Sequence, residues 1–272
     1  MELKLDSFSF RYSPSQPFAL SKVSGVIPKG SCCAILGPTG AGKSTLLLGL
    51  SGALGADHSS GNGDGRISVG AEVFEPMPDR ILFPQVGLCL QDPNIMISGL
   101  QETVYDEIRF SLENIGIDPG DHETRVRSVM NDVGISDLSG RKPSSLSGGE
   151  LQRVALASLL VAQPSILLLD EPVNSLDAEG FTRVARIVRG LHGKTTVVFS
   201  DHQLELAILV ADSILVMREG EVTFSGTKRQ FLNNLGEFKN LLPVGEWQDV
   251  IYRLSGADDR LRRALSTVLG FG

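Results

Sequence analysis

The hydrophobic residues of this chain alternate between the spacings of β-strands and those of α-helices. Alternate positions or short continuous apolar runs predict strands at residues 3–10, 19–27, 31–36, 66–74, 86–90, 166–169, 195–199, 213–216 and 222–224. Three-to-four spacing predicts helices at residues 44–54, 104–115, 123–133, 147–162, 179–191 and 204–210. Strands that alternate with helices in this way indicate an α/β fold whose sheet has a mainly parallel core.

Three segments stand apart from this alternation. Residues 55–65 are rich in Gly, Ser, Asp and Asn and predict a loop. A mostly helical stretch from about residue 98 to 145 is typical of an inserted helical lobe. Residues 245–272 hold two amphipathic pieces, and Ser255 and Asp258 between them fit a helix N-cap and its partner three residues on.

Composition narrows the class of protein. The chain has 272 residues, of which 42% are hydrophobic and 21% charged, so it can bury a substantial core. Its net charge of −7 argues against a dedicated nucleic-acid binder, which usually carries a basic excess. Three cysteines, Cys32, Cys33 and Cys89, lie in apolar runs without metal-type spacing, which predicts reduced core thiols of a cytosolic protein. Neither a signal peptide nor an apolar run long enough to span a membrane is expected.

A glycine-rich loop follows the strand at residues 31–36 and precedes a predicted helix. The loop consists of Gly37, Pro38, Thr39, Gly40, Ala41, Gly42, Lys43, Ser44 and Thr45. Glycines let the backbone wrap phosphates closely, and the order strand, loop, helix is the context that a phosphate loop requires. We expect Lys43 to bridge the β- and γ-phosphates, Ser44 to place its hydroxyl on Mg²⁺, and Thr45 to lie near the phosphates.

Polar residues follow three other predicted strands. Asp170 and Glu171 come directly after residues 166–169, at the end of a strand where open α/β sheets place ligands. Asp170 is expected to hold Mg²⁺ and Glu171 to activate water as a general base. Taken alone, the pair also fits an acidic loop after a core strand. Gln91 and His202 follow strands in the same way, although each of them, taken alone, is more often an ordinary loop, core or capping residue.

A second glycine loop, residues 146–150, runs straight into an apolar helix. Its sequence is Leu146-Ser147-Gly148-Gly149-Glu150. Backbone N–H groups and the positive end of the helix dipole would make it an anion-binding site. One nucleotide does not need two such loops from one subunit. The second loop therefore predicts a site shared between two chains.

In this order, the glycine loop, Gln91, residues 146–150, residues 166–172, residues 175–177 and His202 closely resemble the ATPase domain of ATP-binding cassette (ABC) proteins. The resemblance covers residues 2–232 and implies a P-loop NTPase (RecA-like) core with an antiparallel β subdomain and an inserted α-helical subdomain at about residues 92–162. It leaves residues 233–272 as a C-terminal helical extension. It also implies a head-to-tail pair of cassettes that holds two ATP molecules with Mg²⁺ at the interface.

The resemblance also implies roles for single residues. Tyr12 would stack on adenine, although Phe10 and Phe18 are nearby and a strand aromatic is often simply packed. Gln91 would link Mg²⁺ and water to the helical lobe, and His202 would sense the γ-phosphate.

Further residues would act between the two cassettes. Ser147, Gly148 and Gly149 would grip the partner's ATP, and the loop that ends at Asp177 would communicate across the dimer. The chain departs from the usual pattern at Val173-Asn174 and Ser200-Asp201-His202. Neither departure removes a catalytic group, so hydrolysis is still expected.

Residues 91–94 and 104–117 are similar to a narrower group, the ATPases of energy-coupling factor (ECF) importers of the cobalt and vitamin types. This similarity implies a transmembrane coupling subunit, a membrane substrate-binding subunit and a peripheral position on the cytoplasmic face of the membrane. Residues around 94–107 are then the candidate docking surface, unless they are only the core of the helical lobe. The segment after residue 231 would either add dimer contacts or cap its own domain.

Two functions from different classes follow. The first is the ATP-hydrolysing subunit of an importer of a micronutrient, either a vitamin or a transition metal ion. The alternative is a soluble ABC ATPase that acts on nucleic acid or ribosomes. Such proteins usually carry two cassettes or a coiled-coil arm, whereas this chain has one set of motifs and an acidic balance, so no nucleic-acid partner is expected.

Overall fold

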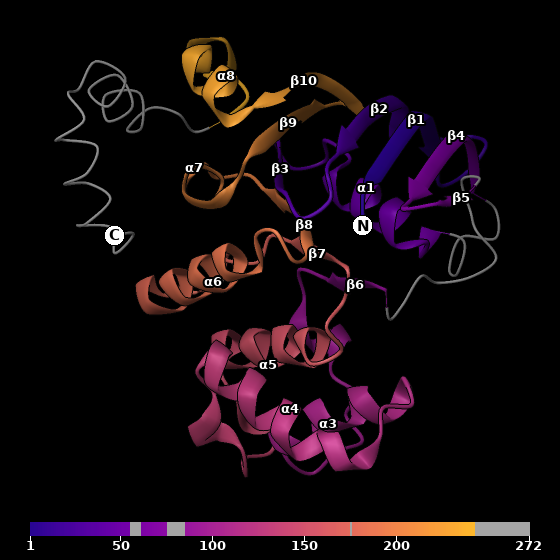
Figure 1. Ribbon diagram of the computed structural model, residues 1–272. Helices are drawn as coiled ribbons and strands as arrows, with labels where there is room; N and C mark the ends of the chain where they lie inside the picture. Colours follow the sequence, from indigo (N-terminus) through magenta and orange to yellow (C-terminus); the bar gives the residue numbers. More distant parts are fainter. Residues whose placement is uncertain (55–60, 75–84, 175, 243–272) are drawn as a thin grey trace, which may run out of the picture.

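The computed structural model describes residues 1–54, 61–74, 85–174 and 176–242. These described residues form two β-sheets, the helices that pack on them, and a separate group of helices (Figure 1). The larger sheet has the order β10-β9-β3-β8-β7-β6. Its strands are β3 (Cys32–Leu36), β6 (Val86–Cys89), β7 (Ile166–Asp170), β8 (Thr196–Asp201), β9 (Ser213–Arg218) and β10 (Glu221–Thr227). Only β10 of these strands runs antiparallel to its neighbour.

The smaller sheet is antiparallel, with the order β2-β1-β4-β5. It consists of β1 (Leu3–Arg11), β2 (Leu20–Ile27), β4 (Asn62–Val69) and β5 (Glu72–Phe74). Helix α1 (Lys43–Ser51) lies between the two sheets and shares a core with both of them. An added Cβ on Gly49 would lie 2.8 Å from the ring of Phe8, so glycine lets α1 approach the smaller sheet closely.

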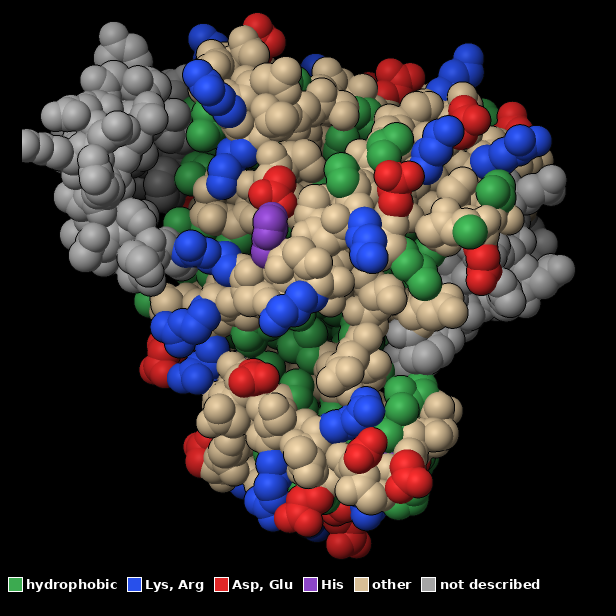
Figure 2. Space-filling model, in the orientation of Figure 1, with side chains coloured by type: hydrophobic (Ala, Val, Ile, Leu, Met, Phe, Trp, Pro, Cys, Tyr) green, Lys and Arg blue, Asp and Glu red, His purple; other side chains and the backbone are tan. Residues whose placement is uncertain are grey.

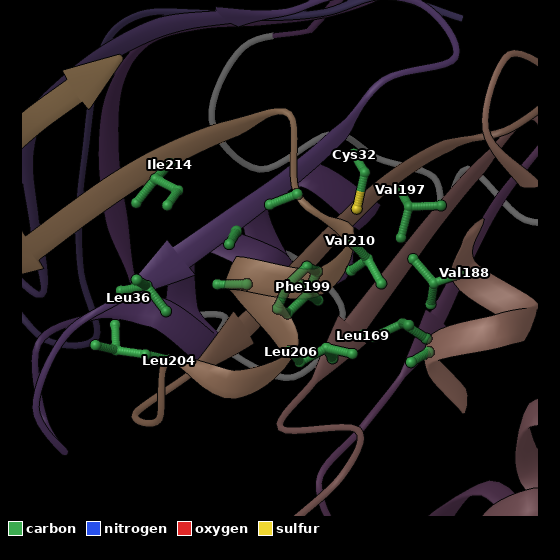
Figure 3. Close-up of a cluster of buried hydrophobic side chains, with 14 of the residues drawn as sticks. Cys32, Leu36, Leu169, Val188, Val197, Phe199, Leu204, Leu206, Val210 and Ile214 are labelled. Carbon is green, nitrogen blue, oxygen red and sulfur yellow. The ribbon is translucent and has the colours of Figure 1, made fainter. Parts of the chain in front are cut away.

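The other face of the larger sheet is covered by α5 (Gly148–Leu160), α6 (Ala178–Leu191), α7 (Glu205–Val210) and α8 (Lys228–Asn233). Figure 3 shows the core on this side, where Phe199 of β8 lies among aliphatic side chains of the strands and helices. Phe231 and Phe238 stack with ring centroids 5.0 Å apart, and the second belongs to η4 (Leu235–Phe238). Packing on this core therefore continues to Leu242, while the predicted amphipathic pieces at 245–272 lie outside the described residues.

A third core belongs to the group of helices at the bottom of Figure 1. It joins α3 (Val104–Asn114) and α4 (Pro119–Val133) to α5, with the short turns η1 (Pro93–Met96), η2 (Ser136–Leu138) and η3 (Pro143–Ser145) between them. This helical lobe follows β6 and leads back to β7, which makes it an insertion between two strands of the larger sheet. The exact domain boundaries, at residues 92–162 and 232, stay predictions.

Register explains why functional residues meet at one edge of the larger sheet. Leu36 of β3 pairs with Asp201 of β8, and Asp170 of β7 pairs with Ser200. The residues that follow these strands therefore leave the sheet side by side, at the carboxyl ends where α/β sheets place ligands. The strands β3, β7 and β8 are buried throughout, as continuous apolar runs predict.

Two details of the strand prediction were wrong. Residues 66–74 form two strands, because Gly70 turns the chain with a φ of +62°. β4 also begins at Asn62, inside the predicted loop, since Asn62 pairs with Arg11 of β1. In both places a turn or a long-range pairing outweighs the local sequence pattern.

Candidate active site

The phosphate loop joins the end of β3 to the start of α1. Two of its glycines are required by close backbone contacts: an added Cβ would lie 2.4 Å from Met217 O at Gly37 and 2.5 Å from Ala19 O at Gly42. At Gly40, which has a φ of +81°, an added Cβ would meet open space. The loop thus packs closely against the backbone of Met217 and Ala19, while Thr39, Gly40 and Ser44 remain exposed. Exposed N–H groups at a helix start suit an anion.

Lys43 lies under this loop and is only 5% exposed. Its Nζ donates hydrogen bonds to Gly37 O at 2.8 Å and to Pro38 O at 3.0 Å. Burial lowers the pKa of the Lys43 ammonium, while the nearby carboxylates of Glu171, Asp170 and Asp201 act in the opposite direction. The positive charge of Lys43, held beneath the exposed part of the phosphate loop, would suit the negative charge of bound phosphates.

Tyr12 follows β1 and reaches the start of α1. Its hydroxyl shares a 2.9 Å hydrogen bond with Thr45 Oγ1, and its ring packs edge-on against Phe10 with centroids 5.0 Å apart. The structure therefore brings Tyr12 to the phosphate loop. Its stacking on adenine stays a prediction.

Glu171 stands at the centre of a polar cluster built from the ends of β6, β7 and β8. Its Oε2 accepts hydrogen bonds from Gln91 Nε2 at 3.0 Å and Asn174 Nδ2 at 3.2 Å. Its Oε1 lies 3.3 Å from His202 Nδ1. The structure thus brings together Gln91, Glu171 and His202, which are far apart in the sequence.

The backbone of Glu171 has a φ of +46°, which side-chain-bearing residues rarely adopt. Its N–H donates to both the hydroxyl and the carbonyl of Ser200, at 3.1 and 3.2 Å. Ser200 Oγ in turn donates to Asp170 Oδ1, and Asp170 is buried. Strain of this kind persists where surrounding contacts over-determine it, and such positions concentrate at functional sites.

Sequence reasoning missed two supporting residues. Ser200 appeared only as part of a departure from a pattern, although its hydroxyl links Asp170 and Glu171. Gln152 of α5 is buried and donates through Nε2 to Pro172 O at 2.7 Å. It ties α5 to the loop after Glu171, and nothing in the sequence distinguishes it from other polar residues on that helix.

The second glycine loop begins α5, in the lower group of helices and away from α1 (Figure 1). Ser147 is the N-cap, and its N–H and hydroxyl donate to Glu150 Oε2 at 2.7 and 2.8 Å. These hydrogen bonds lower the pKa of Glu150. Ser147 and Gly148 are exposed, so this loop faces outward. Asp177 is likewise exposed and caps α6 through a 2.8 Å bond from Gly180 N–H.

A cleft of about 900 Å³ lies elsewhere, between α4, the end of α5 and α6. Its rim carries Arg125, Asp132, Arg186 and Lys194, and it includes none of the predicted site residues. Figure 2 shows basic side chains gathered over α6, above the lower group of helices.

The three cysteines are buried, and burial raises the pKa of Cys33 to about 11 and of Cys89 to about 12, so both thiols stay protonated.

Comparison with known proteins identifies the family. The model of the ABC transporter family matches residues 20–174, more than half of the chain. The chain belongs to the ABC transporter family. A curated relative, the energy-coupling factor transporter ATP-binding protein EcfA of Carboxydothermus hydrogenoformans, is 34% identical over 242 residues, which cover 87% of this chain and 86% of that protein.

Two solved structures share the fold. CbiO1 of Clostridium perfringens, part of the ABC transporter complex CbiONQ, aligns with a TM-score of 0.69 and 26% identity over 93% of this chain and 98% of its own. The ATP-binding cassette MJ0796, a dimer bound to ADP and phosphate, aligns with a TM-score of 0.71 at 23% identity over 83% of this chain and 98% of its own. The predicted P-loop α/β fold is confirmed, and the chain is an ABC ATPase with ECF-type relatives.

This ABC ATPase also carries an exposed apolar surface on its helical lobe. Ile95 and Leu100 are 68% and 76% exposed. The loop between them is anchored by Glu107 of α3, which is buried and accepts from Ser98 N–H at 2.7 Å and from Ser98 Oγ at 2.8 Å. Within the described ranges, no helix combines the length and hydrophobicity that a membrane span needs.

Proposed function

We propose that this chain is the ATP-hydrolysing subunit of an ECF-type importer and energises uptake of a micronutrient, either a vitamin or a transition metal ion. The observation that carries the proposal is the convergence of Gln91, Glu171 and His202 beside a phosphate loop. The ECF-type relative supports the transport class. The protein would work as a peripheral subunit on the cytoplasmic face of the membrane.

ATP would bind along the phosphate loop. The backbone of the loop around the exposed Thr39 and Gly40, together with the start of α1, would supply N–H groups for the phosphates. Lys43 would exchange its hydrogen bonds to Gly37 O and Pro38 O for the β- and γ-phosphates. Tyr12 lies at the same end of the loop and would stack on the adenine.

The residues present also fit a magnesium ion that arrives with ATP. Among the described residues, no group of three or more His, Cys, Asp or Glu side chains is placed to hold a metal by itself. Mg²⁺ usually keeps its waters and binds one or two protein groups together with substrate phosphates. The Ser44 hydroxyl, an Asp170 carboxylate oxygen and the Gln91 amide oxygen would hold it. When bound, it would neutralise charge on the phosphates.

Glu171 would act as the general base for hydrolysis. A water molecule attacks the γ-phosphorus and passes a proton to the Glu171 carboxylate, while the bond from that phosphorus to the β–γ bridging oxygen breaks and ADP leaves. Gln91 and Asn174 hold one carboxylate oxygen of Glu171. Because His202 Nδ1 faces the other oxygen, Nε2 of the ring is left for the γ-phosphate.

A second cassette would complete each site. The exposed Ser147 and Gly148 and the half-buried Gly149 lie at the positive end of α5, where they would suit a phosphate held by another chain. Asp177 would lie at the same interface. ATP would then close two cassettes head to tail, and hydrolysis would let them open.

The docking surface, residues 94–107, would receive the transmembrane coupling subunit, which works with a membrane substrate-binding subunit. Ile95 and Leu100 are exposed in this segment and would supply the apolar contacts to that subunit. Glu107 holds the loop in shape from beneath. Motion of the helical lobe would in this way reach the membrane helices.

Membrane association tests this proposal. Ile95→Glu with Leu100→Glu should lower the fraction of the chain that co-purifies with detergent-solubilised membrane subunits at least about fivefold, since a charge replaces each exposed anchor. ATP binding should be unchanged. Val26→Glu is the matched control, because Val26 is 55% exposed on the smaller sheet. A native chain that never associates with a membrane protein would refute the importer assignment.

A further inference from the structure

Asp201 is a buried carboxylate at the edge of the candidate active site. It is the last residue of β8, is 3% exposed and pairs in register with Leu36, the residue before the phosphate loop. A buried carboxylate destabilises a fold unless it is hydrogen-bonded or paired. The mechanism proposed above assigns roles to Gln91, Glu171 and His202 but none to Asp201.

One oxygen of Asp201 fixes the turn that carries His202. Oδ1 accepts the backbone N–H of His202 at 2.7 Å and that of Gln203 at 2.9 Å. An aspartate that binds the amide two residues on forms a local turn of defined shape. The backbone of His202 is thereby held at the end of β8.

The same oxygen also lies near the imidazole ring. His202 Nδ1 is 3.9 Å from Asp201 Oδ1 and 3.3 Å from Glu171 Oε1. Negative charge on one side of the ring favours a proton on Nδ1. That tautomer leaves Nε2 as the nitrogen that faces away from both carboxylates.

The second oxygen of Asp201 is an orphan. Oδ2 is buried and has no hydrogen-bond partner among the described residues. The charged groups Lys43 and Glu171 and the titratable His202 interact with the carboxyl. Burial raises the pKa of Asp201, and the two backbone hydrogen bonds act against this shift. A buried polar group left unsatisfied calls for an explanation in function.

We propose that Asp201 is a positioning residue for ATP hydrolysis, whose side-chain oxygen holds the backbone turn that carries His202 so that the ring faces Glu171. The inference rests on the proposed function, since it assigns a role within the same reaction. Asp201 acts through His202 and takes no proton from water. Its effect should therefore appear only when His202 is present.

Steady-state hydrolysis by the full chain gives the first test. Asp201→Ala should lower kcat at least about tenfold while the KM for MgATP stays within about twofold, because a displaced catalytic group costs rate more than binding. Asp201→Asn should recover most of the activity, to within about threefold of the native chain, since an amide oxygen still accepts both N–H groups. Equal loss in the two variants would overturn the proposed contact.

Nucleotide preference gives a second readout that does not depend on turnover. In a Glu171→Gln background, we expect Asp201→Ala to lower the preference for ATP over ADP by the same factor as His202→Ala. The combination of all three changes should lower it no further, because residues that act as a unit are not additive. An independent effect of Asp201→Ala when His202 is already absent would overturn the proposal.

Asp212→Ala separates positioning from simple structural support. Like Asp201, Asp212 contacts both a backbone N–H and a histidine: its carboxylate lies 2.8 Å from Cys32 N and 3.1 Å from His192 Nε2. It lies just before β9, outside the candidate site. The Asp212→Ala variant should lower thermal stability without changing nucleotide preference. If the Glu171 and His202 variants hydrolyse ATP normally, the proposed function fails. If they are impaired and Asp201→Ala behaves like Asp212→Ala, only the role of Asp201 fails.

Discussion

Glu171 joins a strained backbone to a side chain held on both oxygens. Its backbone, with a φ of +46°, is fixed by two hydrogen bonds from its N–H to Ser200. Gln91, Asn174 and His202 then fix where its carboxylate points. The carboxylate is therefore fixed in position, which is the arrangement expected of a general base.

Glu171→Gln tests that role at the residue scale. Glutamine keeps the size and one carbonyl oxygen but cannot accept a proton from water, so hydrolysis should fall by about 10²–10⁴-fold. Phosphate release measures this loss, and equilibrium binding should show unchanged ATP affinity. Glu179→Gln is the control, since Glu179 is exposed and pairs with Arg183. Turnover within about threefold of the native chain would reject Glu171 as base.

Sequence reasoning found the residues whose type and place in the chain both point to chemistry. Lys43 stands in a loop of recognisable glycines, and Glu171 and His202 directly follow apolar strands. The roles of Gln152 and Asp201 were not predicted, because they depend on contacts that exist only in the folded protein. The register that sets Asp201 beside Leu36 pairs residues 165 positions apart, and no local pattern encodes it.

At the element scale, the helical lobe carries two surfaces for which we propose different tasks. The start of α5 faces outward with Ser147, and the loop before α3 exposes Leu100. Both elements pack on one core with α4, so we expect movement of one to shift the other. The apolar spacing predicted these helices well, whereas the hairpin of β4 and β5 needed the turn at Gly70.

Glu107→Ala tests whether the loop before α3 is shaped from beneath. The change removes both acceptors of the exposed Ser98, and the loss of two hydrogen bonds to a buried carboxylate should lower the free energy of unfolding by about 1–3 kcal/mol. Co-purification with membrane subunits should weaken while ATP affinity stays the same. Glu113→Ala on the same helix, whose partner is Arg109 on the surface, should change neither. Undiminished membrane binding of Glu107→Ala would contradict the role given to this loop.

At the scale of the whole molecule, we propose that one chain offers two halves of different sites. The phosphate loop, Glu171 and His202 form one half at the edge of the larger sheet, and Ser147 starts α5 in a separate lobe (Figure 1). The phosphate loop residues Thr39, Gly40 and Ser44 are exposed rather than enclosed. An open half-site of this kind suits completion by a second copy or a related cassette.

Mixing two inactive variants tests this account most directly. Lys43→Ala should weaken nucleotide binding, and Ser147→Arg should abolish hydrolysis while leaving ATP binding to the single chain intact. In a mixed dimer, the Lys43 of one chain meets the Ser147 of the other, so one of two sites is whole. The mixture should recover about a quarter of the native ATPase activity, since about half of the dimers are mixed. A mixture as inactive as either variant alone, under conditions where the native chain hydrolyses ATP, would contradict the shared site.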